Sequence, residues 1–241
     1  MSQSSLTIVG TGIKFLAHMT LEARAYIEKS DKVLYLVSDP ALKKWIADAN
    51  TQTEALDNLY FGSEHRADAY AAITDYIIKQ LATPQHLCVA LYGHPTVFSK
   101  PALDAALLAR KQGIDVKILP GISAEACLFA DLMIDPGTCG CQSFEATDFL
   151  LQQRKFDTRC HLILWQPDVI GLTKHASHAN ESGIEWLMQH LLTYYPRDHA
   201  IIIYQAAQYP GMQPAIAAVP LGELTSAAFS PICTIYVKPI V

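Results

Sequence analysis

The amino-acid sequence predicts an α/β protein of two α/β domains, with a parallel sheet in the first and a mixed sheet in the second. Short apolar runs of strand length alternate with helical patterns through the N-terminal half, as in parallel β-α-β units. Glycine-bearing turns follow three of these predicted strands. Around 135–140 the composition changes to glycine, threonine and cysteine, and strands prevail beyond it. We therefore predict one domain over 1–141 and a second over 142–241.

The predicted strands of the N-terminal domain are short apolar runs, at 6–9, 31–37, 86–91 and 116–119. The starts of the helices between them are recognisable. Thr20 and Ser123 can each cap a helix. Pro40 and Pro101 can each open one. A further helix over 66–80 is predicted by Tyr70, Ile73 and Ile77, which recur at helical spacing. The segment before this helix is interpreted as a polar connection.

The C-terminal domain is predicted to be richer in strands, at 162–165, 200–204, 215–219 and 232–238. One clear helix, 183–192, lies among them. Because this order of elements differs from that of the first domain, we expect a mixed sheet and not a second copy of the parallel one.

Composition and charge exclude several classes of protein. Of the 241 residues, 51% are hydrophobic and 17% are charged, which is too apolar for a disordered chain. The formal net charge is −5 with no block of lysine or arginine, so we expect no nucleic-acid partner. No apolar run approaches the roughly 20 residues that cross a bilayer, and the N-terminus lacks the features of a signal peptide. These observations predict a cytoplasmic protein that is not inserted in a membrane.

The six cysteines are consistent with a reducing compartment. Four of them lie in apolar segments, where reduced cysteine packs as a small hydrophobe: Cys88, Cys127, Cys160 and Cys233. The close pair Cys139-Gly140-Cys141 has one intervening residue, which is not the usual zinc spacing. The two histidines of 175–178 are interpreted as part of a polar loop. We expect no bound metal.

Three glycine-bearing turns indicate a ligand site at the carboxyl ends of the parallel strands. They are Gly10-Thr11-Gly12, Gly93-His94-Pro95 and Gly121-Ile122-Ser123-Ala124. Each turn alone is weak evidence, because a glycine after a strand is most often a simple turn. The first turn lacks the third glycine of a dinucleotide fingerprint, and no phosphate loop is present. The set predicts a nucleotide-like cofactor that is held by backbone groups without a pyrophosphate cradle.

In order and spacing, these turns resemble the tetrapyrrole methylase superfamily over essentially the whole chain. The resemblance implies S-adenosylmethionine as the cofactor, bound in a cleft between two α/β domains. Two departures argue against a corrin or porphyrin substrate. Ile13-Lys14-Phe15 stands where the tetrapyrrole enzymes usually carry Pro-Gly-Asp, and His94 stands where they carry Asp.

Several longer blocks are similar to the borosin peptide backbone α-N-methyltransferases, at 92–98, 120–128, 131–137, 142–146 and 164–166. This closer resemblance implies borosin biosynthesis, in which the backbone amides of a ribosomally synthesised precursor peptide (a RiPP) are N-methylated. Many such enzymes carry their substrate as a C-terminal extension. This sequence stops at the end of its last predicted strand, so we expect a split member that acts on a separate precursor peptide.

Methylation of a peptide nitrogen is difficult because the amide lone pair is delocalised into the carbonyl group. An enzyme must stabilise negative charge on the carbonyl oxygen while it orients the nitrogen toward the methyl donor. Arg66 and Tyr70 project from one face of the predicted helix because they lie four residues apart. Without the resemblance, such a pair is usually a solvated helix face. The resemblance implies that Arg66, Tyr70, Tyr92 and Tyr60 are the catalytic residues.

The resemblance also implies a set of cofactor-binding residues, which are Tyr92, His94, Val97, Ser123, Ala124, Gln166, Tyr204, Cys233 and Thr234. The family has a Ser-Thr pair in the last strand, where this chain has Cys233-Thr234. Taken alone, the strand residues of this set would be assigned to the core, and His94 could be a general base or a hydrogen-bonded turn residue.

The resemblance implies a homodimer with the precursor bound across it. Two alternatives stay open on the sequence. One is a C-methyltransferase of corrins or porphyrins. The other is a catalytically silent protein that keeps the S-adenosylmethionine site and holds a peptide.

Overall fold

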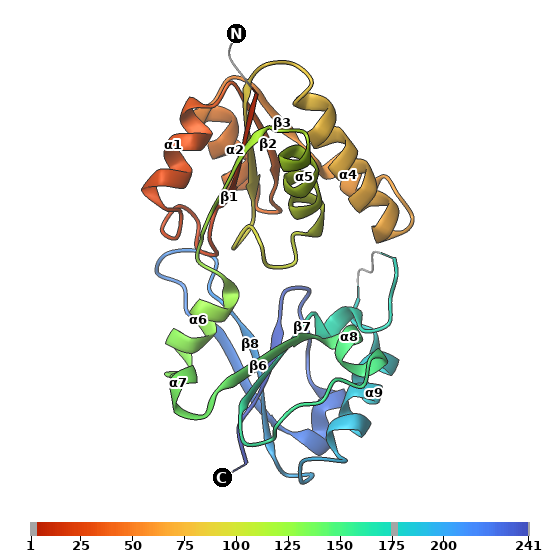
Figure 1. The fold of residues 1–241 in the computed structure, drawn as a ribbon. Coiled ribbons are helices and arrows are strands. Elements are labelled where there is room, and N and C mark those ends of the chain that lie inside the picture. Colours follow the sequence, from red (N-terminus) through yellow and green to blue (C-terminus); the bar gives the residue numbers. More distant parts are fainter. Residues whose placement is uncertain (1–3, 175–177, 241) are drawn as a thin grey trace. The chain divides into compact units, whose positions relative to one another are not determined.

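The computed structural model describes residues 4–174 and 178–240, so most of the loop predicted at 175–178 lies outside the described residues. By its internal contacts the chain divides into two compact units. The N-terminal unit consists of Met1–Ala126 together with Gln208–Met212, and the C-terminal unit of Cys127–Ala207 together with Gln213–Val241. Each unit is built on one sheet (Figure 1). The domain boundary after Cys141 stays a prediction.

The N-terminal unit contains a five-stranded sheet of order β3-β2-β4-β1-β5. All its paired strands are parallel, as the sequence predicts. The strands are β1 (Ser5–Gly10), β2 (Lys32–Leu36), β3 (Thr53–Ala55), β4 (His86–Leu91) and β5 (Asp115–Leu119). Because parallel strands end at the same edge of a sheet, the residues that follow β1, β4 and β5 are brought side by side.

Helices cover both faces of this sheet. They are α1 (Leu21–Lys29), α2 (Pro40–Ala49), α3 (Asp57–Phe61), α4 (Arg66–Gln80) and α5 (Lys100–Lys111). The apolar residues of α1 and α2 pack with one face, and those of α4 and α5 with the other (Figure 1). Burial on both faces is the reason why these strands are continuous apolar runs in the sequence.

The starts of these helices follow local capping chemistry. The Thr20 hydroxyl accepts a hydrogen bond from the backbone N–H of Ala23 at 3.0 Å, as predicted for α1. The Asp39 carboxylate accepts one from the Leu42 N–H at 2.8 Å, and Pro40 occupies the first turn of α2. The segment interpreted as a polar connection instead holds β3 and α3. Both elements are short and contain few buried residues, so neither has a strong apolar period.

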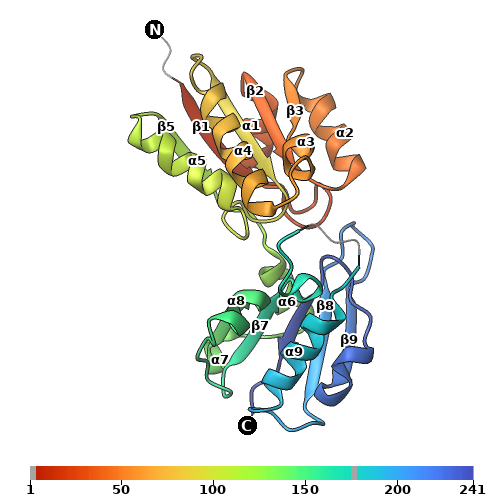
Figure 2. The ribbon, with the colours of Figure 1, turned by 90° about the vertical axis from the view of Figure 1, so that its right-hand side faces the viewer.

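The C-terminal unit has a five-stranded sheet of order β6-β7-β10-β8-β9. Figure 2 labels β7, β8 and β9 of this sheet. Its strands are β6 (Cys141–Glu145), β7 (His161–Trp165), β8 (Ala200–Gln205), β9 (Ala215–Pro220) and β10 (Thr234–Val237). β6 and β7 are parallel and the other pairs antiparallel, which confirms the predicted mixed sheet. The sequence interpretation missed β6, because its residues are half-buried or exposed and form no apolar run.

The remaining described helices are α6 (Ala124–Asp131), which begins in the N-terminal unit, and α7 (Pro136–Cys139), α8 (Ala146–Leu151) and α9 (Glu181–Leu191) of the C-terminal unit. Two short 3-10 helices, Pro167–Val169 and Leu221–Ser226, complete the fold. In the described part of the chain, no helix combines the length and the apolar character that crossing a membrane requires.

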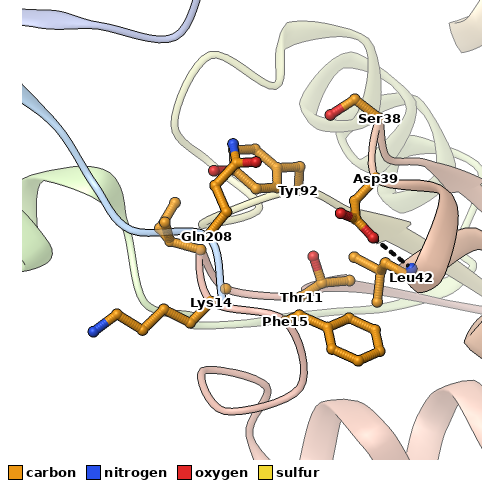
Figure 3. Close-up of a pocket in the computed structure, with 10 residues that line it drawn as sticks. Thr11, Lys14, Phe15, Ser38, Asp39, Leu42, Tyr92 and Gln208 are labelled. Carbon is orange, nitrogen blue, oxygen red and sulfur yellow. Dashed lines mark hydrogen bonds between the residues drawn. The ribbon is translucent and has the colours of Figure 1, made fainter. Parts of the chain in front are cut away.

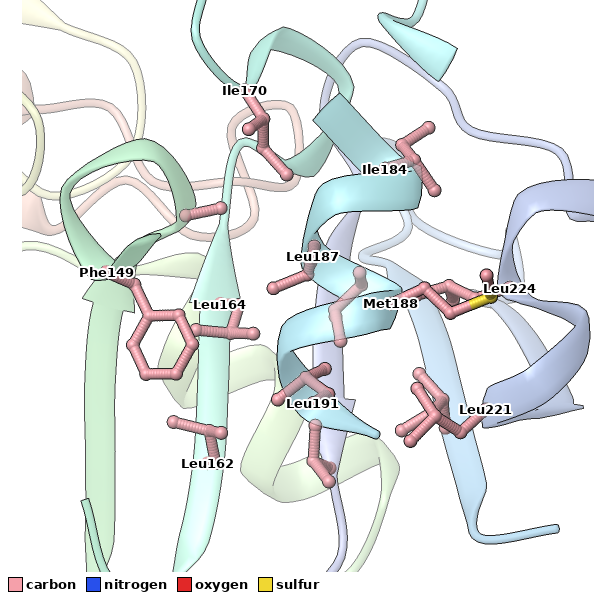
Figure 4. Packing of buried hydrophobic residues seen from close by; sticks show 14 of the residues in the cluster. Phe149, Leu162, Leu164, Ile170, Ile184, Leu187, Met188, Leu191, Leu221 and Leu224 are labelled. Carbon is pink, nitrogen blue, oxygen red and sulfur yellow. The ribbon is translucent and has the colours of Figure 1, made fainter. Parts of the chain in front are cut away.

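The core of the C-terminal unit lies between its sheet and helices α8 and α9 (Figure 4). Phe149 of α8 is fully buried, and its ring lies 5.5 Å from the ring of Phe144 and 5.3 Å from that of Phe156. The ring of His190 meets it edge to face at 5.3 Å. Such ring pairs add to the free energy gained by burying their area.

We predict that Phe149→Ala lowers the free energy of unfolding by about 3–5 kcal/mol, because it removes a buried ring and leaves a cavity. Leu151→Ala, in the same helix but 62% exposed, is the matched control and is expected to change it by about 0.5 kcal/mol or less. Urea unfolding followed by tryptophan fluorescence measures both, and equal effects of the two substitutions would contradict this account of the core.

Candidate functional site

The three glycine turns predicted from the sequence meet at the carboxyl edge of the parallel sheet. A Cβ atom added to Gly10 would lie 2.2 Å from the carbonyl oxygen of Gly93, and one added to Gly121 would lie 3.2 Å from the same oxygen. Gly12 and Gly93 are joined by two backbone hydrogen bonds of 3.2 and 3.1 Å. Both have positive φ, of +73° and +72°, which glycine adopts without strain. We call this meeting point the glycine junction.

A small pocket beside the glycine junction belongs entirely to the N-terminal unit (Figure 3). Its lining residues are Thr11, Gly12, Ile13, Lys14, Phe15, Ser38, Asp39, Leu42, Tyr92 and Gln208. Tyr92 directly follows β4 and is the predicted site residue in this set. The pocket therefore joins the first glycine turn to a residue implied in both catalysis and cofactor binding.

One wall of this pocket comes from the connection between β8 and β9. The backbone N–H of Phe15 donates to the carbonyl oxygen of Gln208 at 2.7 Å. The Tyr209 ring lies 5.9 Å from that of Phe15, and its hydroxyl donates to the Asp39 carboxylate. That hydrogen bond raises the pKa of Tyr209. Sequence reasoning missed Asp39, Gln208 and Tyr209, because no motif links positions so far apart.

Three of the predicted catalytic residues are brought together in the N-terminal unit. Arg66 is the first residue of α4, Tyr70 lies one turn later, and Tyr60 comes from α3. The rings of Tyr60 and Tyr70 are stacked, with centroids 6.3 Å apart and planes at 24°. All three residues are half-buried. We call them the Arg66 cluster.

Within the Arg66 cluster, both Tyr70 and Arg66 influence the pKa of Tyr60. Burial raises the pKa of Tyr60, and the neighbouring Tyr70 raises it further, while the positive charge of Arg66 acts in the opposite direction. The net shift is upward. At neutral pH the Tyr60 phenol is therefore protonated and able to donate a hydrogen bond, as is the always-charged Arg66 guanidinium.

Tyr92 packs differently from the Arg66 cluster. It lies against the core on the face covered by α1 and α2, whereas Tyr60 packs against the core under α4 and α5. The place of Tyr92 beside the first glycine turn favours cofactor contact for this residue.

The other predicted cofactor residues of the N-terminal unit lie in the turns after β4 and β5. The backbone N–H of Thr96 donates to Nδ1 of His94 at 3.2 Å, which orients the ring within its own turn. Val97 is 37% exposed. The Ser123 hydroxyl accepts from the Ala126 N–H at 3.2 Å and so caps α6, as predicted, with Ala124 as the first helical residue.

The predicted cofactor residues of the C-terminal unit lie close together at one end of the three central strands of its sheet. Thr234 at the start of β10 lies opposite Trp165 in β7 and opposite Tyr204 in β8. Gln166 follows β7 in the left-handed conformation, with φ 56° and ψ 46°, which is uncommon for a residue other than glycine. Cys233 directly precedes Thr234. The antiparallel register of β10 thus brings together residues that are far apart in the sequence.

Most of these C-terminal side chains are deeply buried. Tyr204 is 1% exposed and Thr234 2%, while Gln166 is half-buried. The Tyr204 hydroxyl donates to the Asp131 carboxylate at 2.6 Å. Burial raises the pKa of Cys233 to about 12, so its thiol is neutral and offers only weak hydrogen bonding. Backbone groups and Gln166 are the polar groups that this edge presents most readily.

Across the described ranges, 4–174 and 178–240, no group of three or more His, Cys, Asp or Glu residues is arranged to hold a metal ion. The polar groups at these strand ends include hydroxyls, amides, backbone N–H and C=O groups, the carboxylates of Asp39 and Asp131 and the imidazole of His94. This donor set fits an organic ligand with several hydrogen-bonding groups.

Comparison with known proteins identifies the family of this fold. The family model of the tetrapyrrole (corrin/porphyrin) methylases matches residues 5–225. The chain belongs to the tetrapyrrole methylase family. The match includes the sheet and helices of the N-terminal unit and most of the C-terminal unit.

Solved structures show the same tetrapyrrole methylase fold. The chain is similar to uroporphyrin-III-C-methyltransferase from Thermus thermophilus, with a TM-score of 0.70, 18% identity and coverage of 99% of this chain and 93% of that one. A diphthine synthase structure has a TM-score of 0.65, 14% identity and coverage of 97% and 89%. At these identities the likeness concerns the fold alone.

Curated relatives within this family are more similar in sequence. The chain is 36% identical over 240 residues to the methyltransferase/ribosomally synthesized cyclic peptide dendrothelin A precursor of Dendrothele bispora, covering 98% of this chain and 58% of that protein. It is 36% identical over 241 residues to a methyltransferase/ribosomally synthesized type I borosin cyclic peptide precursor of Coprinopsis marcescibilis, covering 97% and 62%. The chain thus spans about three-fifths of these relatives, and the predicted resemblance to borosin methyltransferases is confirmed.

We predict that Gly10→Ala lowers the free energy of unfolding by about 2–3 kcal/mol, because the added methyl group collides with the backbone of Gly93. Gly121→Ala is the matched control in the same junction. Its Cβ has 3.2 Å to the nearest atom, so the expected change is about 1 kcal/mol or less. Chemical unfolding of both variants is the measurement, and a Gly10→Ala protein as stable as the parent would refute the close approach.

Proposed function

We propose that this chain is an S-adenosylmethionine-dependent methyltransferase that α-N-methylates backbone amides of a ribosomally synthesised precursor peptide. The names of its relatives, which combine a methyltransferase with a cyclic peptide precursor, support this reaction class. The observation that carries the proposal is the Arg66 cluster, in which a guanidinium and two phenols lie together in the half-buried part of one unit. That is the donor set that an amide oxygen requires when it becomes negatively charged.

The residues at the two sheet edges fit S-adenosylmethionine, which supplies a methyl group on a positively charged sulfur. The glycine junction brings the turns after β1, β4 and β5 together with no side chain between them, which places the residues of these turns close to one another. We propose that the cofactor is held in the N-terminal unit by Tyr92, His94, Val97, Ser123 and Ala124. In the C-terminal unit the proposed residues are Gln166, Tyr204, Cys233 and Thr234.

The Arg66 cluster suits the chemistry of amide alkylation. As the nitrogen becomes nucleophilic, negative charge develops on the carbonyl oxygen. Arg66 keeps its positive charge at every physiological pH, and the raised pKa of Tyr60 keeps that phenol protonated. Each preorganised donor aimed at such an oxygen contributes about 3–4 kcal/mol to lowering the barrier. Tyr70, one turn from Arg66, orients the set through its stacking with Tyr60.

The substrate and the assembly are further parts of the proposal. We propose that the precursor peptide reaches the Arg66 cluster as a separate molecule and that the enzyme works as a homodimer. An apolar peptide of low charge suits a chain of which only 17% is charged. A corrin or porphyrin would need donors for several carboxylates, and the sequence departs from the tetrapyrrole enzymes in both signature turns.

We predict that Arg66→Ala lowers the rate of methyl transfer about 100-fold or more, because a donor to the developing oxyanion is lost. Tyr70→Phe is expected to reduce the rate because it removes the hydroxyl that hydrogen-bonds to Tyr60, while it leaves the ring stacking in place. The Kd for S-adenosylmethionine should stay within about twofold in both variants, as measured by titration calorimetry, because the cluster acts on the peptide.

Tyr76→Phe is the matched control for these variants. It lies in the same helix, but its hydroxyl donates to the carboxylate of Glu54 in β3. We expect full methyl transfer from this variant. If Arg66→Ala transfers methyl groups at the parent rate, the assigned role of the cluster is wrong.

The substrate class is tested by co-expressing the full chain with small proteins encoded beside its gene, followed by tandem mass spectrometry of the peptides. We expect added methyl groups on main-chain nitrogen, located by fragment ions on both sides of the modified amide. Turnover of a corrin precursor with no peptide modified would favour the C-methyltransferase instead. Cofactor binding without any transfer would favour a catalytically silent binding protein.

A further inference from the structure

A second cluster of reactive side chains lies in the C-terminal unit, at the end of the sheet away from Gln166 and Thr234. Cys139 is the last residue of α7, His161 is the first of β7, and Tyr236 lies in β10. The chain passes from α7 to β6 through Gly140, whose φ of +74° turns the backbone sharply. In the parallel ladder, Cys141 of β6 lies opposite His161. This turn is what places the thiol of Cys139 over the histidine.

The three side chains form a connected hydrogen-bond chain. Sγ of Cys139 lies 3.6 Å from Nε2 of His161, and Nδ1 of His161 lies 2.7 Å from the Tyr236 hydroxyl. When the ring proton is on Nδ1, this nitrogen donates to the Tyr236 oxygen, and the Nε2 lone pair faces the thiol. A nucleophile, a base and a group that orients the base thus stand in line, which is the arrangement that activates a nucleophilic side chain.

Burial supports this arrangement. His161 is 9% exposed and Tyr236 3%. Burial lowers the pKa of His161, so its ring is neutral at pH 7 and its Nε2 lone pair can accept the hydrogen bond of the thiol. Burial also raises the pKa of Tyr236 to about 12, with a further contribution from the neighbouring cysteines. Cys139 itself is half-buried and therefore reachable from solvent.

The other cysteines provide an internal comparison. Cys88 and Cys233 are buried, and burial raises the pKa of each to about 12, so they are expected to be inert. Cys141 and Cys160 are half-buried, as Cys139 is. Exposure does not distinguish these three thiols. The contact of its Sγ with an imidazole nitrogen distinguishes Cys139 from Cys160, whose Sγ lies next to Gly140.

We propose that Cys139 is a redox modification site that reacts with small-molecule disulfides such as oxidised glutathione, with His161 as its base. The thiol proton passes from Sγ to Nε2 of His161. The thiolate attacks one sulfur of the disulfide, a new S–S bond forms to Cys139, and the original S–S bond breaks. The departing thiolate takes the proton from His161 and leaves as a thiol. The disulfide is reduced and Cys139 is oxidised to a mixed disulfide.

This site is independent of the proposed methyltransferase function. None of its three residues belongs to the set proposed for catalysis or for cofactor binding. Either proposal can fail without the other.

The test uses the full, reduced chain incubated with oxidised glutathione. Samples are quenched with N-ethylmaleimide and digested, and the mixed disulfide at each cysteine is quantified by mass spectrometry. We expect Cys139 to react about tenfold faster than Cys160, because the imidazole of His161 accepts the hydrogen bond of the Cys139 thiol and assists the departure of its proton. His161→Gln should slow Cys139 about tenfold and leave the rate at Cys160 unchanged.

Tyr236→Phe provides a milder variant that keeps the ring but removes the hydroxyl that orients His161. It is expected to slow Cys139 by about threefold, and circular dichroism verifies that each variant is folded. A general loosening of the unit would raise the rates at Cys141 and Cys160 as well, so the ratio between sites separates the two effects. Equal rates at Cys139 and Cys160 in the parent, or an unchanged Cys139 rate in both folded variants, would overturn the proposal.

Discussion

The close approach of two backbone segments at Gly10 and Gly93 is the constraint on which the N-terminal unit depends. No side chain fits between them, because a Cβ on Gly10 would lie 2.2 Å from the Gly93 carbonyl oxygen. The approach lets the turns after β1 and β4 bond to each other through Gly12, and it holds the turn after β5 against the same point. The pocket and Tyr92 take their places from this junction.

The Arg66 cluster is formed by a helical spacing within α4 together with a tertiary contact between α3 and α4. The four-residue spacing of Arg66 and Tyr70 places both on one helix face, which is a property of any α-helix. Tyr60 joins them only because the short helix α3 precedes α4 and stacks its ring on Tyr70. Burial then keeps the Tyr60 phenol protonated. The chemistry proposed for the cluster needs all three of these effects.

In the C-terminal unit, strand register has the corresponding role. Because β10 is antiparallel to β7 and β8, its first residue lies beside their last residues, and Thr234 meets Trp165 and Tyr204. The other end of the same strands brings Tyr236 to His161. The central strands of this sheet thus have chemically different groups at their two ends. One end contains the residues proposed for an organic cofactor, and the other contains a thiol beside a base.

The amino-acid sequence alone predicted most of the strands and helices, the parallel and mixed sheets, and the caps at Thr20 and Ser123. These features depend on the spacing of apolar residues and on capping side chains, which are local properties of the sequence. The short elements β3, α3, β6 and α8 were not predicted, since they are half-buried or brief and have no continuous apolar pattern.

The contacts of Tyr209 with Asp39 and of Cys139 with His161 join residues distant along the chain. Such pairs depend on sheet order and on the path of the connections, and no spacing rule encodes them. Which residue types this protein carries for chemistry was therefore visible in the linear sequence. Which of them touch was settled by folding, because burial and register exist only once the strands have paired.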